Sequence, residues 1–240
     1  FSVWTYYLAC AVPLGASAIL GQIYNNMDTI FLGFMDKPAV VGYYSAAYQI
    51  YYILAGVFAL WQASAIPVMT KRLQQDNARA VSFVNKYFRL TVLAYVPIIV
   101  LSFILAPLII ELIYGSVYSE GATAFRYLIW ALAFSITSNT YNLMILVPSG
   151  RYLSLFKAVA FGAVINIVLN FLLIPRFSYV GAAVATLAAE LTVAVLAGIY
   201  ARAAVRLDLY QNIVRPVIFS AGGLLAFALV WWGSAGWPLF

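Results

Sequence analysis

The chain has no histidine and only one cysteine, Cys10, among its 240 residues. Without histidine it can build neither a His-based acid–base pair nor a Cys/His metal cluster, and a lone cysteine excludes a disulfide framework. No glycine-rich motif of the Walker type is present to cradle a phosphate. The loop carboxylates Asp76 and Asp208 each stand alone. We therefore expect no enzymatic activity, no metal, no cofactor and no ATP hydrolysis by this chain.

Charge is scarce as well. Only 8% of the residues are charged and 65% are hydrophobic, with a mean hydropathy of +0.97, whereas soluble domains carry about 25% charged residues. Most charge-free runs reach the ~20 residues that a helix needs to cross a bilayer. The sequence predicts an all-α polytopic membrane helix bundle. Seven spans are expected, near residues 5–34, 43–69, 89–114, 122–147, 153–174, 180–201 and 215–236.

The positive charges predict the orientation, because short cytoplasmic loops hold the excess of Lys and Arg. Only Lys37, Arg126 and Arg176 follow the first, third and fifth spans. The other ten of the 13 basic residues follow the second, fourth and sixth spans, and they are Lys71, Arg72, Arg79, Lys86, Arg89, Arg151, Lys157, Arg202, Arg206 and Arg215. We expect the first helix to start in the cytoplasm, so the net charge of +6 reflects membrane topology and not nucleic-acid binding.

The ends of the chain indicate a fragment. Residue 1 is Phe, the first span begins without a charged flank, and the sequence stops at Phe240 directly after an apolar run. Combined with an odd number of spans, this predicts that residues 1–240 form a single transmembrane domain that is a piece of a longer polypeptide.

Polar residues in the first span mark a candidate site. A carboxylate in hydrocarbon is costly and usually functional, which makes Asp28 the most informative residue. Gly21, Asn25 and Asp28 are spaced by four and three residues, so they share one helical face, and Gln22 lies beside them. We expect Gln22, Asn25 and Asp28 to line a cavity for a substrate or a cation. The alternative is that Asp28 only caps or anchors the helix near the outer interface.

The second span adds Gln49 and Tyr52. Tyrosine rings stack on sugars and their hydroxyls bond to them, so these residues predict a path for a glycan. The alternative is an aromatic belt at the membrane interface, which suits Tyr43 and Tyr44 better.

In the fourth span, Ser135, Ser138, Asn139 and Asn142 form a polar stripe at helical spacing. Asn139 lies about 12 Å from the cytoplasmic end by helical rise, so the stripe must face protein or water. Two interpretations are equally favoured. In one, Asn139 and Asn142 line a path for the substrate, and in the other the stripe only forms hydrogen bonds between helices.

The fifth and sixth spans are joined by a sharp hairpin at residues 176–179. If the turn centres near Ser178, Asn166 and Glu190 lie at similar depth. We expect Glu190 to be held as a structural clamp by Asn166 or by another polar partner on an adjacent helix; proton coupling through Glu190 is the alternative. Lys157 lies ~9 Å further into the membrane than Arg151. It either extends its charge back to the interface or meets an anionic head group.

Several motifs resemble the polysaccharide-biosynthesis export proteins, the Wzx-type flippases. The order and spacing of these motifs carry the resemblance over most of residues 10–200. They are NMDTIFLG at 26–33, VGYYSAA at 41–47, IP at 66–67, LIYG at 112–115, IPRF at 174–177 and GAAVAT at 181–186, followed by Glu190.

This resemblance implies membership of the multidrug/oligosaccharidyl-lipid/polysaccharide exporter superfamily, whose members have two six-helix lobes around a central cavity. The chain would be the second lobe plus one extra helix, and its partners would be the N-terminal lobe of the same protein and membrane lipid. The implied substrate is an oligosaccharide on polyprenyl pyrophosphate, such as an O-antigen precursor for lipopolysaccharide. It would be flipped from the cytoplasmic to the outer leaflet of the inner (cytoplasmic) membrane by alternating access. A cation-coupled drug exporter that uses Asp28 is the second candidate, and a membrane-embedded glycosyl or acyl transferase is a distant third.

Overall fold

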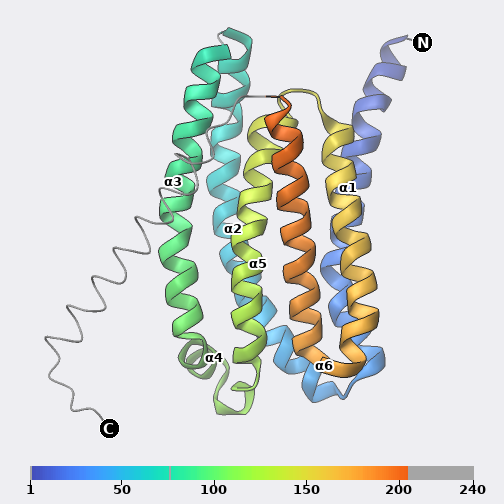
Figure 1. Cartoon of the computed structure of the whole chain (residues 1–240), viewed down its shortest axis with the longest axis vertical. Helices are drawn as coiled ribbons and strands as arrows, with labels where there is room; N and C mark the ends of the chain where they lie inside the picture. Colours follow the sequence, from blue (N-terminus) through green and yellow to red (C-terminus); the bar gives the residue numbers. More distant parts are fainter. Residues whose placement is uncertain (1, 76, 205–240) are drawn as a thin grey trace, which may run out of the picture.

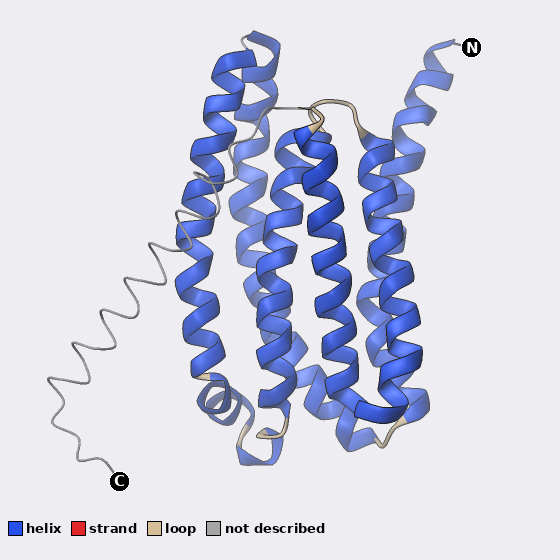
Figure 2. Cartoon of the chain, in the orientation of Figure 1, coloured by secondary structure: helices blue, strands red, loops and turns tan. Residues whose placement is uncertain are grey.

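The computed structural model of the chain describes residues 2–75 and 77–204, and this part contains helices and no strand (Figure 2). The helices are α1 (Ser2–Met35), α2 (Pro38–Gln75), α3 (Asn77–Ile104), α4 (Ala106–Tyr114), a 3-10 turn (Ser116–Tyr118), α5 (Gly121–Tyr141), a π-helical turn (Asn142–Leu146) and α6 (Tyr152–Arg202). The long helices run up and down beside one another as a bundle (Figure 1). The predicted all-α bundle is therefore confirmed; the span expected at 215–236 lies outside the described residues.

Three described helices are long and apolar enough to cross a membrane, namely Pro38–Arg72, Ala78–Ile104 and Tyr152–Arg202. The last holds two spans, because the chain reverses direction at Ser178, which has φ 53° and ψ −136°. We call residues 152–177 and 179–202 the first and second arms of α6. The predicted hairpin at residues 176–179 lies where the structure turns.

The third span differs from its expected bounds of 89–114. Helix α3 already begins at Asn77, and it ends at Ile104. A separate short helix, α4, follows after Leu105, with Pro107 in its first turn. Proline is favoured there because the first helical N–H groups have no partner inside the helix. In Figure 1, α4 lies across the end of α3 instead of continuing it.

Small residues let the two arms of α6 pack closely. A Cβ atom added at Gly181 would lie 2.6 Å from the carbonyl oxygen of Leu173 on the first arm, and one added at Gly162 would clash with Val193 on the second arm. Ala182, Ala183, Ala185 and Ala189 are also buried. The GAAVAT motif is therefore a close-packing surface. The second arm packs against α5, and α1 packs against α6 (Figure 1).

Candidate functional site

Asp28 lies in the interior of the bundle, with 1% of its surface exposed. Its Oδ2 atom accepts hydrogen bonds from the Tyr44 hydroxyl at 2.5 Å and from the Thr186 hydroxyl. Its Oδ1 atom accepts from the Nδ2 atoms of Asn166, at 3.1 Å, and Asn170. A buried charge is tolerated only when such partners replace water. These four neutral donors hold the Asp28 carboxylate between α1, α2 and both arms of α6.

The helical spacing of these partners explains how they meet. Asn166 and Asn170 are four residues apart on the first arm, so they occupy one face, and the Nδ2 atom of Asn170 also donates to Oδ1 of Asn166 at 3.1 Å. Thr186 presents its hydroxyl from the second arm, while Tyr44 is fully buried on α2. The interpretation of Tyr44 as part of an interfacial belt is therefore wrong, because its side chain is buried and its hydroxyl donates a hydrogen bond to Asp28.

Glu190 forms a second buried node, 4% exposed, one turn further along the second arm. The hydroxyl of Tyr24 on α1 donates to its carboxylate, and the side chains of Ser135 on α5 and Tyr51 on α2 lie near it. The expected pairing of Asn166 with Glu190 is wrong, since the amide of Asn166 bonds to Asp28. The prediction from equal depth did not consider α1, which lies against both arms of α6. Helix α1 supplies Asp28 as the partner of Asn166 and Tyr24 as the partner of Glu190.

A polar pocket of about 170 Å³ opens on the other side of α1 and α2. Its lining residues are Asn25, Asn26, Thr29, Ser45, Tyr48, Gln49 and Tyr52. Ser45, Gln49 and Tyr52 are exposed, as is Asn26. The structure thus brings together three of the expected site residues, Asn25, Gln49 and Tyr52, around one hollow.

The other two expected residues of the first span lie elsewhere. Gln22 is exposed, and its backbone oxygen accepts a hydrogen bond from Asn26 at 2.8 Å, but it does not line the pocket. Asp28 is buried and bonded to α2 and α6 and does not line the pocket, so the expectation that it lines one cavity together with Asn25 is wrong. Their three-residue spacing leaves about 60° between them on the helix, and α6 packs at this boundary.

Stacked tyrosines on α2 connect the pocket with both carboxylates. The ring of Tyr48, which lines the pocket, stacks on Tyr44 with centroids 5.4 Å apart and on Tyr51 with centroids 5.1 Å apart. Tyr44 donates a hydrogen bond to Asp28, and Tyr51 lies near Glu190. Sequence reasoning missed Tyr24, Tyr44, Tyr48, Asn170 and Thr186 as site residues. The four-residue repeat of Tyr44, Tyr48 and Tyr52 was the available signal.

The polar stripe of α5 is split. Asn139 is exposed, whereas Asn142 is 5% exposed and its Oδ1 atom has no hydrogen-bond partner. Asn142 begins the π-helical turn, a distortion that often occurs at functional sites. Lys157 is exposed on the first arm, far along it from Asn166 and Asn170. Neither Asn139, Asn142 nor Lys157 belongs to the pocket or to the Asp28 network.

The described residues contain no group of three or more His, Cys, Asp or Glu side chains placed to hold a metal ion. The Asp28 network is nevertheless rich in oxygen, the ligand atom that hard cations prefer. The groups that face the carboxylate are, however, hydrogen-bond donors, and the Oδ1 atom of Asn166 already accepts from Asn170. The Oδ1 atom of Asn170 is buried and unpaired.

Comparisons with known proteins agree with this architecture. The sequence matches the family described as polysaccharide biosynthesis protein over residues 1–123. A Methanocaldococcus jannaschii protein described as uncharacterized membrane protein MJ1068 is 27% identical over 186 residues, which are 77% of this chain and 36% of that protein. The lipid II flippase MurJ in an inward closed conformation superposes with a TM-score of 0.70 at 18% identity, covering 95% of this chain and 49% of MurJ. The chain therefore spans about a third and about half the length of these two proteins.

Proposed function

The chain belongs to the polysaccharide biosynthesis protein family, and on this premise we propose that it is one lobe of a flippase for lipid-linked oligosaccharide. The multi-pass helical fold is that of MurJ, and the share of MurJ that it covers supports the expectation of a second lobe. The substrate would be an oligosaccharide on a polyprenyl pyrophosphate, turned from the cytoplasmic to the outer leaflet of the inner membrane. Rocking of two lobes around a cavity would alternate the access, as in repeat-built transporters.

The polar pocket between α1 and α2 is the observation that carries this proposal. Exposed amides and hydroxyls on membrane helices need protein, water or a polar ligand. Gln49 and Asn25 offer both donors and acceptors, and Tyr52, 39% exposed, offers a ring face for a sugar. We assign the glycan to this surface and the pyrophosphate to the expected cytoplasmic side, where Arg151, just before α6, and Lys157 on its first arm carry positive charges.

Export of lipid-linked glycan, measured with the chain joined to its partner lobe, tests the assignment. Gln49→Leu and Tyr52→Leu should each reduce export at least about fivefold, because a site built to hydrogen-bond a substrate loses ~1–3 kcal/mol when one polar partner is removed. Tyr52→Phe, which keeps the ring, should retain more activity than Tyr52→Leu. The matched control is Tyr127→Leu, since Tyr127 is 38% exposed on α5 and outside the pocket. Parental export by both pocket variants would overturn the assignment.

A cation-coupled exporter remains the second candidate function, and the buried, unpaired Oδ1 atom of Asn170 beside the Asp28 carboxylate favours it. A monovalent cation bound there would tie α1 to both arms of α6. Its binding should raise the melting temperature of the purified protein when Na⁺ replaces choline at constant ionic strength, because a ligand that binds only the folded state stabilises it. Asp28→Asn should abolish the shift, and the control Glu190→Gln should keep it. A shift that persists in Asp28→Asn would exclude this site.

A further inference from the structure

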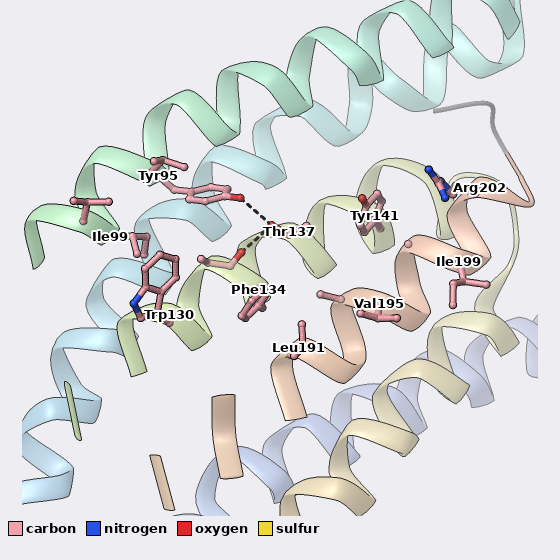
Figure 3. Close-up of a pocket in the computed structure, with 15 residues that line it drawn as sticks. Tyr95, Ile99, Trp130, Phe134, Thr137, Tyr141, Leu191, Val195, Ile199 and Arg202 are labelled. Atoms are coloured by element: carbon pink, nitrogen blue, oxygen red, sulfur yellow. Dashed lines mark hydrogen bonds between the residues drawn. The ribbon is translucent and has the colours of Figure 1, made fainter. Parts of the chain in front are cut away.

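A groove of about 540 Å³ runs along the bundle between α3, α5 and the second arm of α6 (Figure 3). Aliphatic and aromatic side chains make up most of its wall, among them Ile99, Trp130, Phe134, Leu191 and Val195. The hydroxyls of Tyr95 and Thr137 already bond to each other at 3.2 Å. Their pairing leaves an apolar channel of the size that protein sites offer to small ligands.

The groove is separate from the proposed glycan surface. On α5, the groove residues Trp130, Ala133 and Thr137 lie on the side of the helix opposite to Ser135 and Asn142, by the helical repeat of 100° per residue. Since Ser135 faces the Glu190 node, the groove opens away from it. Leu191, Val195 and Ile199 line it and are each more than two-fifths exposed. An exposed apolar surface on a helix that is long and apolar enough to cross a membrane, as α6 is, suits contact with lipid.

The length of the groove matches one leaflet. Its wall on the second arm extends from Leu191 to Arg202, and on α5 from Trp130 to Tyr141. Eleven residues of helix rise about 16 Å, which is roughly half of the ~30 Å hydrocarbon thickness. A further transmembrane helix would need a groove as long as the full hydrocarbon thickness, whereas one acyl chain of one leaflet needs only half of it. The length of the groove therefore suits an acyl chain.

One end of the groove is charged. Arg202 lines it beside Tyr141 (Figure 3), and it belongs to the set of basic residues that predicts the cytoplasmic side. Arginine is a preferred partner for phosphate because its planar fork donates two parallel hydrogen bonds. The wall contains no acidic residue. Apolar walls along one leaflet and a single cation at head-group depth complement an anionic phospholipid.

We propose that this groove binds an anionic phospholipid of the cytoplasmic leaflet, with one acyl chain between α3, α5 and α6 and the phosphate at Arg202. The bound lipid would fill the space between α3 and the second arm and tie the helix that carries Thr186 and Glu190 to the surrounding membrane. This site is independent of the glycan pocket and of the Asp28 network.

The fluorescence of Trp130 reports on the groove directly, because Trp130 lines the groove at the end opposite to Arg202. In the full chain reconstituted into vesicles, Trp130 is kept as the single tryptophan and the other five are changed to Phe. Quenching by phosphatidylglycerol with brominated acyl chains is compared with quenching by brominated phosphatidylcholine at equal mole fraction. We expect at least about twofold stronger association of the anionic lipid at Trp130. A single-Trp61 version is the control, because Trp61 is 44% exposed on α2 and outside the groove, and it should show no preference.

Substitutions of Arg202 and of Ala194, which both line the groove, complete the test. Arg202→Gln should remove the preference at Trp130, whereas Lys157→Gln, which removes an exposed cation on the first arm, should leave it. Ala194→Phe should weaken quenching by both lipids, since it fills the groove. Equal quenching by both lipids in the parent, or a preference that survives Arg202→Gln, would overturn the proposal. So would a Trp130 that neither lipid reaches, because the groove would then be covered by another segment such as residues 215–236.

Discussion

Asp28 on α1 and Thr186 on the second arm of α6 are hydrogen-bonded although 158 residues separate them. One turn towards the start of α1, the hydroxyl of Tyr24 donates to Glu190, so here the carboxylate belongs to α6 and its hydrogen-bond donor to α1. At the opposite end, the hydroxyl of Ser178 donates to Asp36. Successive contacts advance along α1 by the number of residues by which they recede along α6. The two helices are therefore paired antiparallel in one fixed register.

Replacing Asp28 by Asn tests how much this register depends on the carboxylate. An amide oxygen cannot accept all four hydrogen bonds, and the new NH₂ group opposes the amides of Asn166 and Asn170. We expect normal membrane insertion but a folded state less stable by about 1–3 kcal/mol, seen as a lower melting temperature in detergent, together with impaired glycan export. Glu111→Gln, at an exposed position of α4, is the control for loss of a carboxylate. If the Asp28→Asn variant has the melting temperature and the export activity of the parent, the carboxylate of Asp28 is needed neither for stability nor for transport.

Glu190→Gln should preserve folding and most of the transport activity. The amide oxygen can still accept from Tyr24, and its NH₂ group can donate to Ser135 or Tyr51, so the four-helix contact is kept. Glu190→Leu should instead leave these hydroxyls unpaired and destabilise the protein by about 1–3 kcal/mol per lost buried partner. Thermal melting and export of both variants provide the measurement. Complete loss of transport in a well-expressed Gln variant would indicate proton chemistry at Glu190.

Gly181→Val should weaken the hairpin of α6. Even a Cβ atom at this position would lie 2.6 Å from the Leu173 carbonyl oxygen, so the two arms must separate, at a cost of about 1–3 kcal/mol. Loss of thermal stability is the expected result. Gly56→Val serves as control, because no atom within 4 Å would meet a Cβ there. Equal melting of the two variants would contradict the packing assigned to the motif.

The charge count makes a separate prediction about orientation. In a Cys10→Ala background, a cysteine at Asn77, the first residue of α3, should be shielded in intact cells from a reagent that does not cross membranes. A cysteine at Lys37, between α1 and α2, should be labelled. Labelling of position 77 from outside would show that the orientation is the reverse of the predicted one. The proposed phospholipid site would then lie in the other leaflet.

The sequence alone determined the helices, most of their bounds and the hairpin near Ser178, because these depend on local properties. Apolar runs of sufficient length must be helical in a bilayer, where every backbone N–H and C=O needs a partner within the segment. Proline and polar residues at the expected turn interrupt such runs. The residues that line the pocket, Asn25, Gln49 and Tyr52, were also accessible from helical spacing.

Only the tertiary structure decided which polar side chain meets which. Asn166 bonds to Asp28 and not to Glu190, and Tyr44 is buried instead of interfacial, because α1 packs against both arms of α6. Helical periodicity gives the face of a residue on its own helix but not the neighbour that covers that face. The register between α1 and α6 depends on hydrogen bonds across more than 130 residues of chain, and the packing of the two arms of α6 depends on small residues such as Gly181. Such long-range contacts form only when all the helices are assembled.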